Sequence, residues 1–285
     1  MSQARKKAEQ SDPTVARGNL TWVEHEPVTL GYPELAHGFG TKLGAGRRAR
    51  AKIDFSDPPE GGDAKPLKQN LADLAKDLGI AQERVVYPRQ EHGARVLVIR
   101  QDEMPESLEG LREERADALI TDVPNLALAI RTADCIPILL YDHRAGVIAA
   151  VHAGWRSTVA GILEKTLKIM AKEFNTEGSV LVAAIGPGIG FDSFEIEEPV
   201  LSKFRERFDF WSRFARPTRN NRWLMDLKMI NAYILASTGM PEKNLLLSPL
   251  CTVQENELFY SYRREGDGAG RMLNFIMRRE EAQKS

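Results

Sequence analysis

The sequence contains few of the residues that stabilise secreted or membrane-bound proteins. Its 285 residues include only two cysteines, which cannot build a disulfide framework, so we expect a reducing compartment and a cytoplasmic location. No apolar run approaches the roughly 20 residues needed to cross a bilayer. The charged N-terminal segment lacks the apolar stretch of a secretory signal. These absences exclude a disulfide-stapled scaffold and predict a protein without a membrane anchor.

Net charge is almost absent as well. Lysine and arginine number 39 and aspartate and glutamate 40, which leaves a formal charge of -1 and a pI near 6.6. A general nucleic-acid binder normally carries a marked basic excess, so this balance argues against one. We therefore expect a small-molecule substrate, no nucleic-acid or membrane partner, and a monomer or weak homodimer.

The chain is organised as a leader followed by one domain. Residues 1–20 are predicted to be disordered, and residues 21–285 to form a single catalytic domain. Helical spacing predicts one helix that ends at Gly79 and a longer one from Trp155 to Phe174. Strands are predicted at 84–88, 94–100, 116–121, 125–131, 136–142, 146–152, 180–186, 244–250, 258–264 and 271–277. Because strands outnumber helices and follow one another closely, we expect an α+β layered sandwich rather than a doubly wound sheet.

Histidine is scarce too, so the choices for a metal site are few. His92 precedes a predicted strand, Cys135 lies between two strands, and His152 ends a buried one. Zinc prefers Cys sulfur and His nitrogen, and a catalytic zinc typically has three protein ligands. However, a lone buried Cys is commonly an inert small hydrophobe, and the spacing matches no compact zinc signature. From the residues alone, the three could form a metal site or could be structural residues without a ligand.

Five ordered motifs between about residues 36 and 278 resemble the YfiH-like family. Members of this family have been called polyphenol oxidases (laccase-domain proteins), peptidoglycan editing factors and purine nucleoside phosphorylases. The motifs are RQEHGARV, ADALITDVPNLALAIRTADCIPILLYD, VIAAVHAGWRSTVAGIL, AAIGPGIG and FYSYRREGDGAGRMLNFI. The resemblance implies an α-β-β-α sandwich of mixed sheets flanked by helices. It also implies that His92 of Q-x-H-G, Cys135 of T-A-D-C and His152 of V-H-A-G-W are the metal ligands.

Two departures from the family pattern matter. No cysteine follows A-A-I-G-P, which removes extra thiols as copper ligands, and Glu265 replaces the Asp of S-Y-R-R-D-G. With these departures the resemblance implies zinc as the cofactor, with copper less favoured. The implied activity is phosphorolysis of adenosine, inosine or methylthioadenosine, together with adenosine deamination.

This activity assigns roles to further residues. Cys135 and His152 would serve catalysis as well as metal binding. A proton acceptor is also needed, and Asp134 and Glu91 are the carboxylates nearest to ligands in sequence, although neighbours on a strand point to opposite faces.

Phosphorolysis requires an anion site besides the metal. The planar fork of arginine suits phosphate oxygens, so Arg131, Arg263 and Arg271 are candidates to contact phosphate or ribose. For each of them a surface salt bridge is the alternative. His37, in an H-G-F element shared with the family, is expected to line the substrate pocket.

Three residues are left without a role in the site. His25 and His143 are predicted as surface or loop residues, and Cys251 as structural.

Three other functions stay open. Copper-dependent phenol oxidation normally needs many histidines, including H-x-H pairs, whereas this chain has five histidines and no such pair. A Cys–His hydrolase acting in peptidoglycan quality control would use Cys135 as nucleophile and His152 as base. A non-enzymatic role in cell-wall or division quality control is the last alternative.

Overall fold

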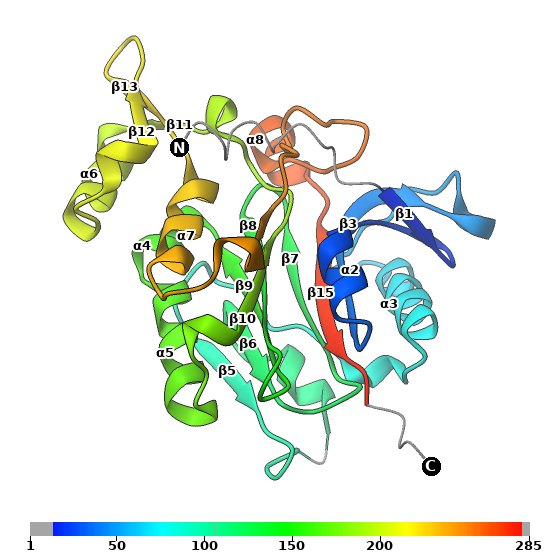
Figure 1. Cartoon of the computed structure of the whole chain (residues 1–285). Helices are drawn as coiled ribbons and strands as arrows, with labels where there is room; N and C mark the ends of the chain where they lie inside the picture. The colour runs from blue at the N-terminus through cyan, green and yellow to red at the C-terminus, as the bar shows by residue number, and fades with distance from the viewer. Residues whose placement is uncertain (1–13, 106, 281–285) are drawn as a thin grey trace.

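The computed structural model describes residues 14–105 and 107–280. Two mixed sheets pack face to face in the middle of the molecule, and helices cover both outer faces (Figure 1). This is the α-β-β-α sandwich that the sequence predicts.

The first sheet has six strands in the order β1-β2-β3-β15-β7-β4. Their bounds are β1 Thr14–Arg17, β2 Leu20–Val23, β3 Leu35–Gly44, β15 Met272–Arg278, β7 Ala127–Thr132 and β4 Val85–Val86. The C-terminal strand β15 lies antiparallel between β3 and β7, so the two ends of the domain meet in one sheet.

The second sheet also has six strands, in the order β14-β10-β8-β9-β6-β5. Their bounds are β14 Leu245–Leu247, β10 Leu181–Ile185, β8 Ile136–Asp142, β9 Val147–Ala153, β6 Ala118–Thr121 and β5 Val96–Ile99. All of them fall within strands predicted from short apolar runs, apart from a final residue in β9.

The helices are α2 Glu26–Gly31, α3 Lys65–Leu78, α4 Trp155–Val159, α5 Ile162–Phe174, α6 Glu198–Arg207, α7 Leu227–Ala236 and α8 Tyr262–Glu265. A small third sheet, in the order β11-β13-β12, stands beside α6 (Figure 1). Its strands are β11 Glu195–Glu197, β13 Arg222–Met225 and β12 Ala215–Pro217.

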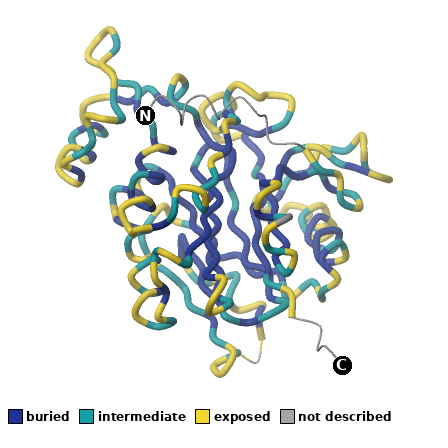
Figure 2. Tube along the Cα trace, viewed as in Figure 1, coloured by how far each residue is buried: buried dark blue, intermediate teal, exposed yellow. Residues whose placement is uncertain are grey.

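Three apolar layers hold the sandwich together, and Figure 2 shows the central strands as its most buried part. Helix α3 packs Leu71 and Leu74 on the outer face of the first sheet. Between the sheets, Leu128 of β7 and Ile148 of β9 share one cluster. The outer face of the second sheet is covered by α5, α6 and α7.

The predicted long helix from Trp155 is divided in two. Gly161 has φ +80°, a left-handed conformation that breaks the helical path between α4 and α5. By contrast, the predicted stop of α3 is confirmed, because Gly79 caps that helix with φ +72°.

The aromatic strand predicted at 258–264 is wrong. The segment forms a turn and the short helix α8, which Ser261 caps by accepting a hydrogen bond from the Arg264 N–H. The backbone N–H of Arg263 donates to the Asp134 carboxylate. The N–H groups of Arg263 and Arg264 are therefore not available for pairing with another strand.

The predicted leader over residues 1–20 lies mostly outside the described residues. Residues 14–17 and 20–23 form the β1–β2 hairpin, so this part of the leader prediction is wrong. No helix in the described part of the chain is long and apolar enough to span a membrane.

Candidate metal centre

The three residues singled out in the sequence come together at one edge of the sandwich. His92 lies on the connection from β4 to β5 and Cys135 on the connection from β7 to β8, and both connections cross from the first sheet to the second. Strands β4 and β7 are parallel, so these connections leave the same edge. His152, near the end of β9, pairs with Pro137 at the start of β8 and therefore lies at that edge too.

Their side chains converge. One nitrogen of each histidine and the Cys135 sulfur lie within 4.8 Å of one another. The rings of His92 and His152 are 4.9 Å apart between centroids and inclined by 75°. His152 is only 2% exposed and Cys135 is half-buried, whereas His92 is exposed. The trio is therefore backed by the interior at His152 and open to solvent at His92.

Asp117 lies beneath the trio, and sequence reasoning missed it. It precedes β6 and is fully buried. Its Oδ1 is 2.8 Å from Nδ1 of His152 and accepts a hydrogen bond from the His92 N–H at 3.0 Å. Its Oδ2 accepts from the Gly93 N–H at 2.7 Å. A charged residue directly before a buried strand was the only signal in the sequence.

A second anchor holds the loop that carries His92. The side-chain amide of Gln90 accepts from the Arg131 N–H at 2.7 Å and donates to the Arg131 carbonyl at 2.8 Å. Gln90 thereby pairs with β7 as a strand residue would, while Asp117 ties the same loop to the second sheet. His92 itself has φ +59°, an uncommon conformation for a residue with a side chain.

Gly154 closes the site from the side of α4. It follows His152 by two residues and forms the N-cap of that helix. A Cβ at this position would lie 2.8 Å from the Cys135 sulfur and 3.2 Å from Cδ2 of His92. Only a glycine lets the backbone pass so close to both side chains.

The charges within the trio reinforce one another. Burial alone would raise the pKa of the Cys135 thiol, but the charge of His152 and hydrogen bonds with His152 and His92 lower it to about 6. Burial would lower the pKa of His152, yet the Cys135 thiolate and the Asp117 carboxylate raise it to about 9. The thiolate, which is the form that binds metals, is thus favoured near neutral pH.

Asp117 stays ionised for the same reason. Burial would raise its pKa, but the hydrogen bond and charge of His152 and the N–H groups of Gly93 and Glu91 hold the pKa below its usual value.

Comparison with known proteins identifies the family of the chain. A family model described as multi-copper polyphenol oxidoreductase laccase matches residues 38–279. The chain belongs to this family. The family resemblance predicted from the motifs is therefore confirmed.

Two similar proteins have names that refer to different reactions. A purine nucleoside phosphorylase of Bacteroides thetaiotaomicron is 35% identical over 249 residues, which cover 86% of this chain and 92% of the relative. Adenosine deaminase RL5, from an unknown prokaryotic organism, is 34% identical over 242 residues, or 82% of this chain and 90% of the relative. The crystal structure of YlmD from Geobacillus stearothermophilus is 30% identical, with a TM-score of 0.81 over 94% of this chain and 98% of that one.

Asp134 lies next to Cys135, but its carboxylate is held by other groups. Oδ1 accepts from the Thr252 hydroxyl at 2.5 Å, and Oδ2 accepts from the Ser261 hydroxyl at 3.0 Å and the Arg263 N–H at 2.6 Å. These contacts join the turn before Cys135 to the turn before α8. A carboxylate with three donors is suited to hold this turn, and proton transfer through it would require some of these bonds to break.

Glu91, the other predicted proton acceptor, is exposed beside His92. Its carboxylate forms an ion pair with Arg115 at 3.3 Å.

Arg131 faces away from the trio. Along β7 its side chain follows Ala127 and Ala129, which belong to the apolar cluster under α3 on the outer face of the first sheet. Its guanidinium pairs with Asp57 at 2.7 Å and stacks over Tyr87 at 5.1 Å.

The arginines near the C-terminal turn bind backbone carbonyls. Arg263 donates to the carbonyls of Ser193 and Glu195 at 3.3 and 3.1 Å. Arg271 donates to the carbonyls of Ala269 and Gly270, two residues of its own turn.

His37 and His25 are both buried. His37 is 2% exposed on β3, and its Nε2 accepts a hydrogen bond from the His25 N–H at 3.1 Å. His25 is 4% exposed, with Nε2 3.3 Å from the Ile185 carbonyl. The sequence predicts it as a surface or loop residue, and it lies in the connection between β2 and α2 but not at the surface. His143 is exposed, and Cys251 is buried, with its sulfur accepting from the Gly190 N–H.

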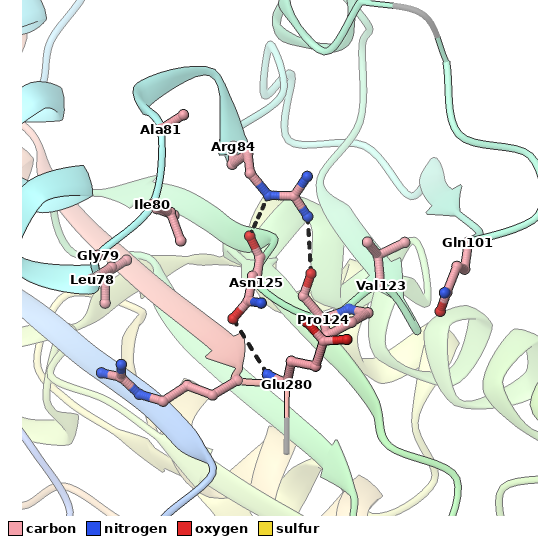
Figure 3. A pocket seen from close by; sticks show the side chains of 11 residues that line it. Leu78, Gly79, Ile80, Ala81, Arg84, Gln101, Val123, Pro124, Asn125 and Glu280 are labelled. Atoms are coloured by element: carbon pink, nitrogen blue, oxygen red, sulfur yellow. Dashed lines mark hydrogen bonds between the residues drawn. The ribbon is translucent and has the colours of Figure 1, made fainter. Parts of the chain in front are cut away.

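A separate cavity of about 740 Å³ lies at the opposite edge of the sandwich (Figure 3). It is lined by residues that precede β4 and β7 and by residues that follow β15, far along these strands from the trio. The Arg84 guanidinium there donates to the carbonyls of Asn125 and Pro124, as Figure 3 shows. These hydrogen bonds connect the residues before β4 with the residues before β7, and they occupy the Arg84 guanidinium with backbone carbonyls.

Proposed function

We propose that this chain is a zinc-dependent purine nucleoside enzyme. It would cleave adenosine, inosine or methylthioadenosine with phosphate and would also deaminate adenosine. The observation that carries the proposal is the convergence of His92, Cys135 and His152 within 4.8 Å at an open edge. The names of the two relatives, a purine nucleoside phosphorylase and an adenosine deaminase, supply the reaction classes.

The donor set fits zinc. One thiolate and two imidazoles match the ligands that zinc prefers, and three protein ligands leave one position for substrate or water. Zinc held in this way acts as a Lewis acid and supplies a water nucleophile near neutral pH. The residues of the chain would hold it as follows: His152 from the buried side, Cys135 from the crossing turn, and His92 from the exposed loop.

The two reactions differ in the bond that breaks. In phosphorolysis the bond from C1′ to the purine nitrogen breaks, a phosphate oxygen bonds to C1′, and the released purine takes up a proton. In deamination an oxygen from water bonds to C6 of adenine, and ammonia leaves. Both need the nucleoside on the solvent-facing side of the trio, where His92 is exposed.

Phosphate needs a cation at the same edge. Arg131, Arg263 and Arg271 remain candidates, but each would have to exchange the partners described above. Arg156 is better placed, because it lies two residues beyond Gly154, is exposed, and stacks over Trp155 at 4.5 Å. No carboxylate in the described part of the chain pairs with it. We therefore assign phosphate contact to Arg156.

A second candidate function is a Cys–His hydrolase. It is supported by the position of His152, which lies near the Cys135 sulfur and is hydrogen-bonded to the Asp117 carboxylate. In hydrolases of this kind a histidine base lies in the same way between the nucleophile and an orienting carboxylate. Multicopper oxidation is less well supported, because one three-residue cluster is the only candidate metal site among the described residues. Both cysteines are free, which suits the cytoplasmic location we propose.

The test is incubation of zinc-loaded protein with adenosine and phosphate, with adenine, inosine, hypoxanthine and ribose 1-phosphate separated by chromatography. We expect turnover that falls by on the order of 100-fold or more in His152→Ala. His143→Ala is the matched control, since it removes an exposed histidine at the far end of β9. Absence of turnover, or equal turnover by His152→Ala, would contradict the proposal. Full turnover after exhaustive chelation would favour metal-independent Cys–His chemistry.

A further inference from the structure

We propose that Asp117 is the positioning residue of the metal centre, and that its one carboxylate sets the orientation of two ligands at once. The proposal rests on the proposed metal binding by the trio. Asp117 lies 35 residues before His152 in the chain, and the pairing of β6 with β9 brings the two residues into contact.

The first ligand oriented in this way is His152. A carboxylate only accepts hydrogen bonds, so the 2.8 Å contact requires the proton of the neutral ring to be on Nδ1. The lone pair is then on Nε2, the nitrogen available to a metal. The backbone reinforces the contact, because the Asp117 carbonyl accepts from the His152 N–H at 2.8 Å. Asp117 and His152 are therefore joined through both their side chains and their backbones.

The second ligand is His92. Three consecutive N–H groups, those of Glu91, His92 and Gly93, point to the Asp117 carboxylate at 3.4, 3.0 and 2.7 Å. Such an array fixes the backbone of the loop, and His92 holds its uncommon φ of +59° within it. Without the carboxylate these N–H groups would lose their acceptor and the loop would be free to change conformation.

An uncharged side chain at position 117 could not orient both His152 and the loop of His92. Oδ1 serves His152 and His92, and Oδ2 serves Gly93, so both oxygens must be acceptors. An asparagine has one acceptor oxygen, and its NH₂ group would face either the His152 Nδ1–H or the Gly93 N–H. Asp117→Asn therefore keeps the shape of the side chain and disrupts one of the two ligands.

The experiment compares the zinc affinity of wild type, Asp117→Asn and Asp142→Asn by competition with a chromophoric chelator. Asp142 is the matched control: it is fully buried and its Oδ1 accepts from the N–H groups of Arg144 and Ala145, but at the far end of β8. We expect affinity to fall about 10- to 100-fold in Asp117→Asn, as for other residues that orient metal ligands, and to stay within about twofold in the control. Circular dichroism and thermal melting report on folding.

A spectroscopic measurement on wild type makes the test independent of any variant. In ¹⁵N spectra of zinc-loaded protein we expect His152 to show a protonated Nδ1 and a zinc-bound Nε2. Zinc on Nδ1 would overturn the proposal, as would unchanged affinity in Asp117→Asn or an equal loss in Asp142→Asn. Failure of wild type to bind zinc would instead overturn the proposed metal function itself.

Discussion

Gly154 passes so close to Cys135 that a Cβ on the glycine would lie 2.8 Å from the sulfur. The φ of Gly154 is -68°, which any residue adopts, so the glycine is required for space and not for backbone conformation. The V-H-A-G-W motif therefore contributes twice to the proposed metal site: it supplies the His152 side chain, and Gly154 leaves the space that the Cys135 side chain occupies.

Gly154→Ala is expected to damage the metal site while leaving the fold intact. The added methyl would force Cys135 or His92 to move, so zinc affinity should fall by at least about tenfold. Chelator competition measures the affinity and thermal melting the fold. Gly110→Ala is the control, since a Cβ there meets open space. Unchanged affinity in Gly154→Ala would show that the trio is looser than its contacts indicate.

The two cysteines should respond differently to substitution by serine. Cys135→Ser is expected to purify without stoichiometric zinc, because a hydroxyl is a much weaker zinc ligand than a thiolate. Cys251→Ser should retain the metal, since its sulfur contacts Gly190 and Ser193 outside the trio. Elemental analysis of the purified variants measures this. Retention of zinc by Cys135→Ser would remove the thiolate from the ligand set.

Asp134→Asn is expected to lower the free energy of unfolding by about 1–3 kcal/mol, because the amide cannot accept all the bonds that the carboxylate accepts. Urea unfolding measures the loss, and Thr252→Val, which removes one of the three donors, should reproduce part of it. A proton acceptor would behave differently: the variant would lose kcat at unchanged stability. That outcome would return Asp134 to the catalytic role predicted from its place beside Cys135.

Arg156→Gln is expected to raise the KM for phosphate about tenfold, equivalent to about 1.4 kcal/mol, with zinc affinity unchanged. Loss of a charge-assisted hydrogen bond to phosphate is the physical reason. Initial rates at varied phosphate measure the effect. Arg213→Gln is the matched control, since Arg213 also stacks on an aromatic ring, that of Tyr233. If KM responds to Arg263→Gln instead, phosphate lies nearer to α8.

Much of the fold was predictable from local patterns. The runs that form β8, β9 and β10 are apolar and short, and α3 has helical spacing with Gly79 at its end. The prediction failed where a distant contact decides the local structure. The segment at 258–264 is rich in aromatics, yet Asp134 binds the Arg263 N–H and a turn forms in place of a strand.

From the sequence by itself, family motifs predicted His92, Cys135 and His152 as the donors of the proposed metal site, out of five histidines and two cysteines, and the structure places these three side chains together. Only the tertiary structure decided which carboxylate supports them. Asp134 is adjacent to Cys135 in the chain, but its oxygens accept hydrogen bonds from Thr252 and Arg263 near the C-terminal end. Asp117 is 35 residues from His152, and the antiparallel pairing of β6 with β9 brings them into contact. Hydrogen bonds depend on the distance and direction between atoms in space, and adjacency in the sequence does not determine either.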